Sequence, residues 1–222
     1  MEKPGLLAFD VNETLLSLEP LRALFQERFG GEISLAEWFA RLLHGSVLAN
    51  ALEVFRPFDE IGVESLVIMG RRRGLEIDPE EARSIVATLA EAPPHPDVLP
   101  TIESLADAGV RMIALTNGST EVANAQVSNA GLARWLERVI SVDEVGRFKP
   151  DPLPYLYAAT VMGVGIGHVT LVAAHDWDCA GAMATGAGAV FVSRPGALWA
   201  LPSSPPELVM SDLSPLAAQL AR

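Results

Sequence analysis

The alternation of hydrophobic and polar stretches begins with a short apolar run at residues 6–9 that ends at an aspartate. Asp10 is followed by the turn-forming residues Asn12 and Glu13. An apolar run of this length, closed by turn formers, predicts a buried strand of a parallel sheet rather than a helix. Asp10 would then lie at the carboxyl end of that strand, where open α/β sheets bind their ligands.

Residues 16–94 have a different pattern, with apolar positions at helical spacing and no convincing strand. The spacing predicts four helices, at residues 20–29, 34–48, 60–73 and 79–92. Gly30, Gly74 and Pro93 follow three of them, as expected at helix ends. We therefore expect a helical cap, inserted after the first strand and standing over its carboxyl end.

From His95 onward, predicted strands alternate with predicted helices. Four further strands are expected, at residues 111–116, 139–142, 169–174 and 189–192. Such alternation is typical of parallel β-α units. We predict an α/β protein whose core is a three-layer Rossmann-like parallel sheet formed by residues 1–15 and 95–222, with the helical cap at residues 16–94. The tail from Leu201 is expected to be irregular and to end in a short helix.

Charge and composition restrict the partners. Sixteen basic against 28 acidic residues give a formal charge of −12, which disfavours nucleic acid but allows a local basic pocket for a small anion. The single Cys179 excludes an intrachain disulfide, and no Cys/His cluster has zinc spacing. No apolar run approaches the ~18 residues of a membrane span. We expect a soluble, cytoplasmic protein with no membrane partner.

Polar residues lie at or shortly after the predicted ends of four strands. Asp10 follows the first strand and Thr116-Asn117 the second, Lys149 lies in the connection after the third, and Asp178 follows the fourth. Because carboxyl ends of parallel strands meet at one edge of a sheet, these groups should converge. One aspartate after a strand is usually a turn former or helix cap. Four aligned ends with these residue types indicate an active site.

The same residues resemble the motifs of the haloacid dehalogenase superfamily, and the resemblance spans nearly the whole chain. It implies that Asp10 is a nucleophile, that Thr14 orients it, and that Lys149 balances its charge. Asp178 matches the acidic fourth motif. The helical insertion after the first motif is similar to the first cap type of the superfamily.

Two branches of this superfamily compete. Its phosphatases need an acidic residue two positions after the nucleophile, and Asn12 at that position cannot donate a proton in that way. They also need a magnesium-ligating aspartate where this chain has Ala174, although Asp176 could supply a carboxylate. We expect no metal and no cofactor, and a magnesium-dependent phosphatase stays the alternative.

Further residues resemble the other branch, the L-2-haloacid dehalogenases (type II). This resemblance implies a substrate- and halide-binding group made up of Asn12, Arg41, Phe58, Thr116, Asn117, Tyr155, His175 and Trp177. Arg41 matches the arginine that holds the departing halide. The chain departs from the pattern where Asn12 replaces an aromatic residue, Glu13 a glycine, Ala173 a serine and His175 an asparagine.

The chemistry implied by the resemblance is hydrolytic removal of halide from a short 2-haloalkanoic acid. Asp10 would displace the halide and form an aspartyl ester. Water would then hydrolyse the ester, helped by Asp178 and His175, and release a 2-hydroxy acid. The alternatives are the magnesium-dependent phosphatase and a binding module that has lost turnover. The leucine-rich cap could support a homodimer, because relatives of this branch often pair.

Overall fold

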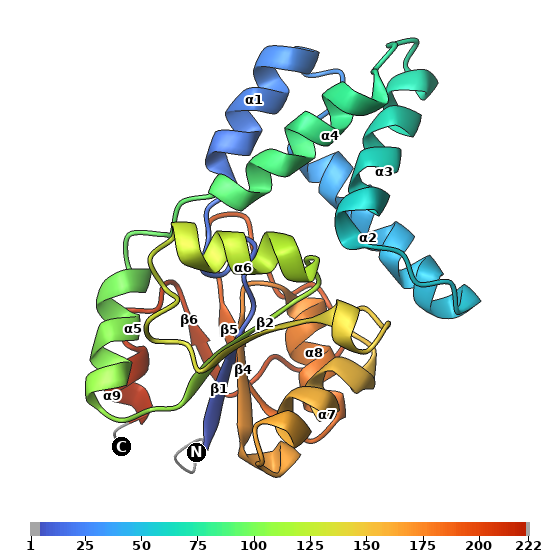
Figure 1. Cartoon of the computed structure of the whole chain (residues 1–222). Coiled ribbons are helices and arrows are strands. Elements are labelled where there is room, and N and C mark those ends of the chain that lie inside the picture. The colour runs from blue at the N-terminus through green and yellow to red at the C-terminus, as the bar shows by residue number, and fades with distance from the viewer. Residues whose placement is uncertain (1–4, 221–222) are drawn as a thin grey trace.

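The computed structural model describes residues 5–220, and its centre is a parallel sheet with six strands (Figure 1). The predicted core also included residues 1–4 and 221–222, which lie outside the described residues. The strand order is β3-β2-β1-β4-β5-β6, so that the strand preceding Asp10 is central. The strands are β1 (Leu6–Phe9), β2 (Met112–Thr116), β3 (Arg138–Ser141), β4 (Val169–Ala173), β5 (Gly188–Val192) and β6 (Leu208–Met210).

Helices cover both faces of the sheet, and the central strand is therefore apolar at every position. Leu7 and Phe9 pack into one hydrophobic cluster, with residues of α5, α6 and α9, whereas Leu6 and Ala8 pack into a second one with α7 and α8. The helices of the core are α5 (Val98–Asp107), α6 (Thr120–Asn129), α7 (Pro152–Val161), α8 (Asp176–Ala184) and α9 (Leu216–Leu220). The predicted three-layer α/β fold is confirmed.

The tail differs from the prediction in one respect. Residues 208–210 form β6, a parallel edge strand that pairs with β5, where an irregular segment was expected. The run is only three residues long and follows a cluster of prolines and serines, so its apolar pattern alone did not indicate a strand.

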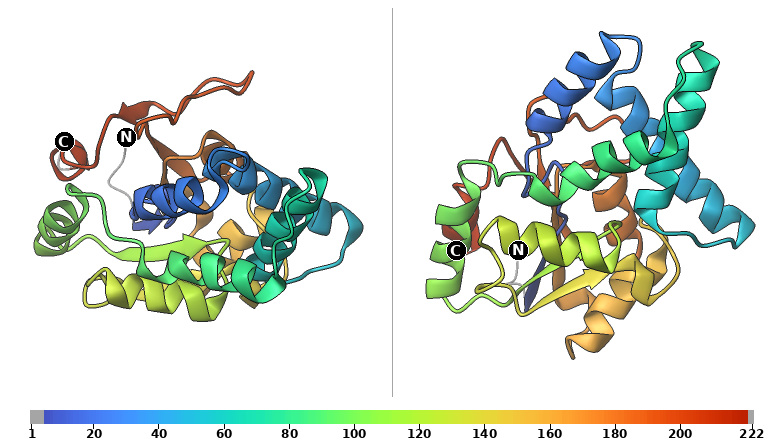
Figure 2. Two further views of the ribbon diagram at one scale, coloured as in Figure 1. Left: turned by 90° about the horizontal axis from the view of Figure 1, so that it is seen from above. Right: turned by 45° about the horizontal axis from the view of Figure 1, so that its top comes forward.

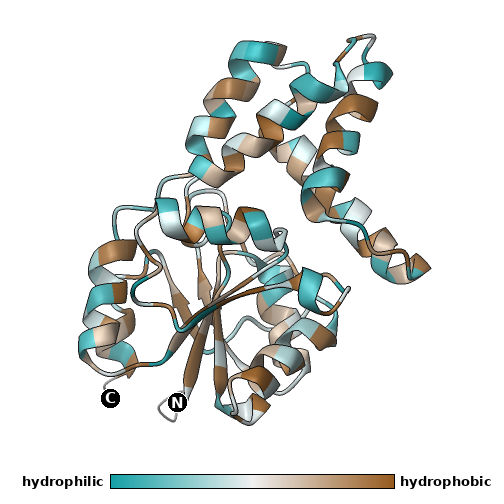
Figure 3. Cartoon of the chain, in the orientation of Figure 1, coloured by the Kyte–Doolittle hydropathy of each residue, from teal (hydrophilic) through white to brown (hydrophobic). Residues whose placement is uncertain are grey.

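Four further helices lie between β1 and α5 and stand on the carboxyl-end side of the sheet (Figures 1 and 2). They are α1 (Glu19–Phe29), α2 (Leu35–Leu52), α3 (Phe58–Arg72) and α4 (Pro79–Ala87). Most of their apolar residues pack against one another and the core, whereas Val47, Leu48 and Leu52 near the end of α2 are exposed (Figure 3). None of the helices in residues 5–220 is long and apolar enough to cross a membrane.

Close packing of α2 against α3 gives the cap its shape. Trp38 is fully buried between these helices, and its indole N–H donates to the carbonyl of Gly62 at 2.8 Å. A Cβ at Gly62 would lie 3.1 Å from the Trp38 ring, and one at Gly45 would lie 2.7 Å from Ile61. Glycine is therefore required where the two backbones approach.

Backbone and side-chain hydrogen bonds fix the cap on the core. The two connecting segments run antiparallel, with Ser17 N–H donating to Pro93 O and His95 N–H to Leu15 O. At the far end of α2, the Asn50 amide bonds both the N–H and the carbonyl of Phe148, next to Lys149. The cap is thus tied to the two segments that carry Asp10 and Lys149.

Candidate active site

Asp10 is almost completely buried at the end of β1, and both of its carboxylate oxygens accept hydrogen bonds. Oδ1 accepts from the Lys149 ammonium at 2.9 Å. Oδ2 accepts from the Thr14 hydroxyl at 2.7 Å and from His175 Nδ1 at 3.0 Å. Burial alone would raise the pKa of Asp10, but the charges and hydrogen bonds of Lys149 and His175 hold this pKa well below its usual range. The side chain is therefore a carboxylate.

Lys149 joins two carboxylates in the interior. Its Nζ donates to Asp10 Oδ1, to Asp178 Oδ2 at 2.6 Å and to the Leu115 carbonyl at 2.8 Å, so that its three N–H groups are all used. Burial would lower the pKa of Lys149, but Asp10 and Asp178 raise it. Tyr155 completes the cluster by donating to Asp178 Oδ1 at 2.6 Å. Burial raises the pKa of Asp178 against the opposing charge of Lys149.

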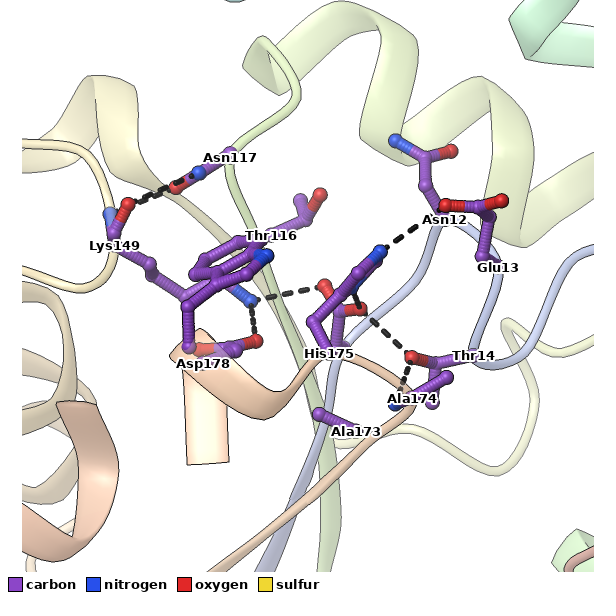
Figure 4. A network of polar contacts seen from close by, with 12 residues as sticks. Asn12, Glu13, Thr14, Thr116, Asn117, Lys149, Ala173, Ala174, His175 and Asp178 are labelled. Carbon is purple, nitrogen blue, oxygen red and sulfur yellow. Dashed lines mark hydrogen bonds and ion pairs between the residues drawn. The ribbon is translucent and has the colours of Figure 1, made fainter. Parts of the chain in front are cut away.

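Thr14 has a fixed hydroxyl direction. Its Oγ1 accepts from the backbone N–H of Ala174 at 2.8 Å, and its one proton therefore goes to Asp10 Oδ2. This contact joins the loop after β1 to the end of β4. The structure thus brings the four predicted residues Asp10, Thr14, Lys149 and Asp178 into one hydrogen-bonded network (Figure 4).

His175 lies at the start of α8 between two carboxylates. Its Nδ1 faces Asp10 Oδ2, and its Nε2 faces Glu13 Oε2 at 3.1 Å (Figure 4). Both partners are acceptors, so both ring nitrogens carry protons. Burial lowers the pKa of His175, but its hydrogen bonds to Asp10 and Glu13 outweigh that effect and raise the pKa to about 10. Phe39 of α2 and Trp177 stack on the ring, with centroid distances of 5.8 and 5.1 Å.

Asn117, at the end of β2, positions Lys149. Asn117 Oδ1 accepts from the backbone N–H of Lys149 at 2.8 Å, and its Nδ2 donates to the Lys149 carbonyl at 3.3 Å. Thr116 Oγ1 accepts from Gly118 N–H at 3.0 Å and closes the turn. Both ends of the Asn117 amide thus contact the backbone of Lys149, and the predicted contact with halide stays a prediction.

Asn12 has a partner that the sequence did not predict. Gln126 of α6 is fully buried, and its Nε2 donates to Asn12 Oδ1 at 2.8 Å and to the Leu89 carbonyl at 2.9 Å. The Asn12 oxygen therefore points to Gln126, and its Nδ2 has no hydrogen-bond partner among residues 5–220. Gln126 shares the buried face of α6 with Ala123 and Val127, and a polar residue on an apolar helix face was the available signal.

A cavity of about 210 Å³ separates the cap from the carboxyl ends of β1 and β2. Asn12 and Gly118 line it from the core, and Leu42, Phe58 and Val86 line it from the cap. Drug-sized ligands occupy cavities of about 300–1,000 Å³. This cavity is suited to a smaller molecule. Phe58 is buried and lines this cavity.

Arg41 is not brought into this network. It forms no hydrogen bond or ion pair with any of the described residues and does not line the cavity. Phe39, two residues earlier on α2, is the side chain that reaches His175. Residues two apart on a helix leave it on different sides, so Arg41 does not share the face of α2 from which Phe39 reaches His175. The predicted contact of Arg41 with a departing halide stays a prediction.

The residues present do not fit the magnesium site of the phosphatase branch. Both Asp10 oxygens are bonded to cations, Lys149 and His175, rather than left for a metal. Asp176, the substitute carboxylate considered from the sequence, accepts instead from the backbone N–H groups of Trp177 and Ala200. Across the described part of the chain, no group of three or more His, Cys, Asp or Glu residues is arranged to hold a metal ion.

Comparison with known proteins identifies the family to which this chain is similar. The family model of the haloacid dehalogenase-like hydrolases matches residues 5–184. The chain is 27% identical over 199 residues to haloacetate dehalogenase H-2 of Moraxella sp. strain B, covering 88% of each protein. It is 28% identical over 193 residues to an (S)-2-haloacid dehalogenase of Pseudomonas sp. strain YL, covering 86% of this chain and 83% of the relative.

A solved structure of a dehalogenase has the same fold as this chain. A crystal structure of a dehalogenase with an intermediate complex superposes with a TM-score of 0.89 at 26% identity, covering 100% of this chain and 99% of that one. With an aspartate at the end of the central strand, its lysine and threonine partners, and a family model matching most of its length, the chain belongs to the haloacid dehalogenase-like hydrolases.

Proposed function

We propose that this hydrolase removes halide from short 2-haloalkanoic acids through an ester on Asp10 and releases a 2-hydroxy acid. The observation that carries the proposal is the ionised Asp10 carboxylate beside Asn12, an amide where a phosphatase has its acid. A halide leaves as a stable anion and needs no proton, so a nucleophile without a neighbouring acid suits this reaction. The relatives named as haloacetate and (S)-2-haloacid dehalogenases support the same substrate class.

The first step would use Oδ1 of Asp10. Oδ1 accepts one hydrogen bond, from Lys149, whereas Oδ2 accepts two. Oδ1 therefore has the freer lone pair and attacks the carbon that bears the halogen. The new bond joins Oδ1 to that carbon, and the halide departs with the electrons of the carbon–halogen bond. The Asn12 Nδ2 group at the cavity is the donor that would stabilise the departing halide.

The second step would return Asp10 to its carboxylate. Water attacks Cγ of the ester, and the bond between Cγ and Oδ1 breaks, so that Oδ1 leaves with the 2-hydroxy acid. One water proton goes to the product alkoxide and the other is released to solvent, in balance with the halide. Asp178 lies on the other side of Lys149, and its raised pKa suits it to pass on that proton.

The test is a direct comparison of two products. Purified protein is incubated with chloroacetate, 2-chloropropionate and fluoroacetate, and with a generic phosphate ester, in the presence and absence of a chelator. We expect halide release that is insensitive to the chelator and is lost in Asp10→Asn. Magnesium-dependent release of phosphate without halide would favour the phosphatase instead. Ligand binding without either product would favour a silent binding module.

We also propose that the protein forms a homodimer through the cap. Four apolar residues at and just after the end of α2 are exposed, namely Val47, Leu48, Leu52 and Val54. Exposed apolar side chains that form a contiguous patch mark interaction sites in soluble proteins, and the four residues lie close together in the sequence. Analytical ultracentrifugation should give twice the 23.7 kDa chain mass and, in Leu52→Glu, the monomer mass. A wild-type protein that sediments as a monomer at all concentrations would contradict this assignment.

A further inference from the structure

We infer that His175, held by Glu13, forms with Thr14 a charged oxyanion hole on Oδ2 of Asp10 and acts in hydrolysis of the ester. The inference rests on the proposed function, because it concerns the second step of that reaction. It gives a role to two residues, Glu13 and His175, at which the chain departs from the pattern of the L-2-haloacid dehalogenases.

The two carboxylate oxygens of Asp10 accept hydrogen bonds from different donors. Lys149 binds Oδ1, whereas Thr14 and His175 both donate to Oδ2, at 2.7 and 3.0 Å. Once Oδ1 carries the alkyl group, Oδ2 is the carbonyl oxygen of the ester. Attack of water on Cγ moves the carbonyl electron pair onto Oδ2. Donors at about 2.7–3.1 Å from such an oxygen are at the distance that stabilises an oxyanion.

Both donors are held in place before the ester forms. The Thr14 hydroxyl is oriented by the Ala174 N–H, as described above. His175 is confined between Phe39 and Trp177, so its ring cannot rotate away from Asp10 without disturbing the cap. Donors that need no reorganisation at the moment of reaction are the effective ones.

Glu13 supplies the charge that keeps His175 a cation. Ester formation neutralises Asp10, and the imidazolium then keeps one carboxylate partner, Glu13 at 3.1 Å. Glu13 has a φ of 59°, in the left-handed region that favours glycine and is unfavourable for other residues. Its backbone thus adopts an unfavourable conformation while its carboxylate contacts His175. Glu13 is a positioning residue, and His175, which contacts the reacting group, is a catalytic one.

Other charged groups near His175 are engaged elsewhere. Glu13 and His175 line a cavity of about 460 Å³ together with Arg22, Asp176 and Arg194. Arg22 pairs with Glu19, and Asp176 is bonded to backbone N–H groups. Arg194 donates from Nη1 to both carboxylate oxygens of Asp97 and from Nε and Nη2 to the Thr14 carbonyl. Glu13 and Asp10 are therefore the carboxylates that the described structure places on the ring nitrogens of His175.

A donor and a general base predict opposite pH profiles. If His175 donates to Oδ2, the rate constant of ester hydrolysis falls at high pH, as the ring loses its proton. If it takes a proton from water, that rate constant rises as the ring loses its proton. Replacing Glu13 by Gln removes the counter-charge, so the fall should begin at a lower pH than in the wild type.

The experiment is a rapid-quench reaction with 2-chloropropionate, in which halide and intact-protein mass are followed together. In His175→Gln we expect a burst of halide, accumulation of protein that carries the alkyl group, and ester hydrolysis slowed about 10²–10³-fold, the usual loss for one oxyanion donor. In Glu13→Gln, the rate constant of ester hydrolysis should begin to fall at a lower pH than in the wild type. Asp176→Asn, which changes a neighbouring carboxylate that is bonded elsewhere, should leave both steps unchanged.

The outcomes separate the two proposals. A wild-type protein that is never alkylated by any haloacid contradicts the proposed function and this inference with it. A wild type that turns over, together with a His175→Gln variant in which alkylation and hydrolysis slow equally, contradicts the inference alone. If that variant fails to fold, Glu13→Gln decides: a hydrolysis rate that rises with pH, or one that keeps the wild-type profile, overturns the donor role.

Discussion

Gln126 and Asn12, which are 114 residues apart in the sequence, form a buried amide pair at the mouth of the site, with Gln126 Nε2 lying 2.8 Å from Asn12 Oδ1. Because Gln126 also donates to the Leu89 carbonyl, its own amide cannot flip without losing that bond. The pair therefore fixes which end of the Asn12 amide is free. The free end is the Nδ2 donor, and Asn12 lines the cavity between the cap and the core, where we propose that the halide departs.

Gln126→Leu should release this constraint and weaken stabilisation of the leaving halide. Loss of one hydrogen bond is worth about 1–1.5 kcal/mol, so we expect kcat/KM to fall about tenfold. The loss should be larger for fluoroacetate than for chloroacetate, because fluoride is the poorer leaving group and depends more on donors. Steady-state halide assays measure both.

Asn129→Ala is the matched control for Gln126. Asn129 lies on the same helix and donates to the neighbouring carbonyl, that of Ala90, but does not contact Asn12. It should lower stability without changing the preference between the two haloacetates. Equal changes in preference in both variants would show that the effect comes from the position of α6 and not from Asn12.

Lys149→Met should reduce stability as well as activity. It leaves two buried carboxylates, Asp10 and Asp178, without their cation, and breaking a buried pair in this way costs about 3–5 kcal/mol. The double variant with Asp178→Asn removes one of the unpaired charges and should recover part of the free energy of unfolding, with no recovery of halide release. Urea unfolding measures the first quantity. A single variant as stable as the wild type would contradict the ion-pair network.

Phe39→Ala should lower the rate of halide release more than Arg41→Ala does, although the family resemblance assigns the halide contact to Arg41. Phe39 stacks on His175, whereas Arg41 forms no hydrogen bond or ion pair within residues 5–220. We expect Arg41→Ala to keep halide release near the wild-type rate and Phe39→Ala to lower it. The reverse order would restore Arg41 as the residue that holds the halide.

The protonation of His175 should make the fold less stable at alkaline pH. Its pKa is raised from 6.5 to about 10 in the folded protein, so folding favours the protonated ring. This contribution is complete below pH 6.5 and is lost as the pH rises from 6.5 through about 10. The free energy of unfolding of His175→Asn should therefore fall less steeply over this interval than that of the wild type. Parallel slopes would contradict a charged His175.

The sequence was sufficient to predict that the residues at and after the strand ends lie close together. Asp10 and Asp178 each follow a strand closely, and Lys149 lies in the connection after another. Parallel strands bring such positions to one edge whatever their separation along the chain. The four helices between β1 and α5 were predictable for a different reason, because they are long and amphipathic enough for their apolar spacing to indicate them.

Contacts that depend on helix rotation were not predictable from the sequence. Phe39 and Arg41 leave α2 in directions about 200° apart around the helix axis, and the apolar pattern does not show which of these directions faces His175. The bond from Gln126 to Asn12 likewise depends on how α6 is placed against the loop after β1. The pairing of Glu13 with His175 needed the left-handed backbone at Glu13, where the sequence offered no glycine as a signal.

The most direct test of the account is a single turnover in heavy-oxygen water, with excess enzyme over 2-chloropropionate, followed by mass spectrometry of the peptide that contains Asp10. The ester route predicts one heavy oxygen in the Asp10 carboxylate and none in the hydroxyl of the product, because water attacks Cγ and Oδ1 leaves with the 2-hydroxy acid. Heavy oxygen in the product hydroxyl with an unlabelled Asp10 would mean that water displaces the halide directly, and would contradict Asp10 as the nucleophile.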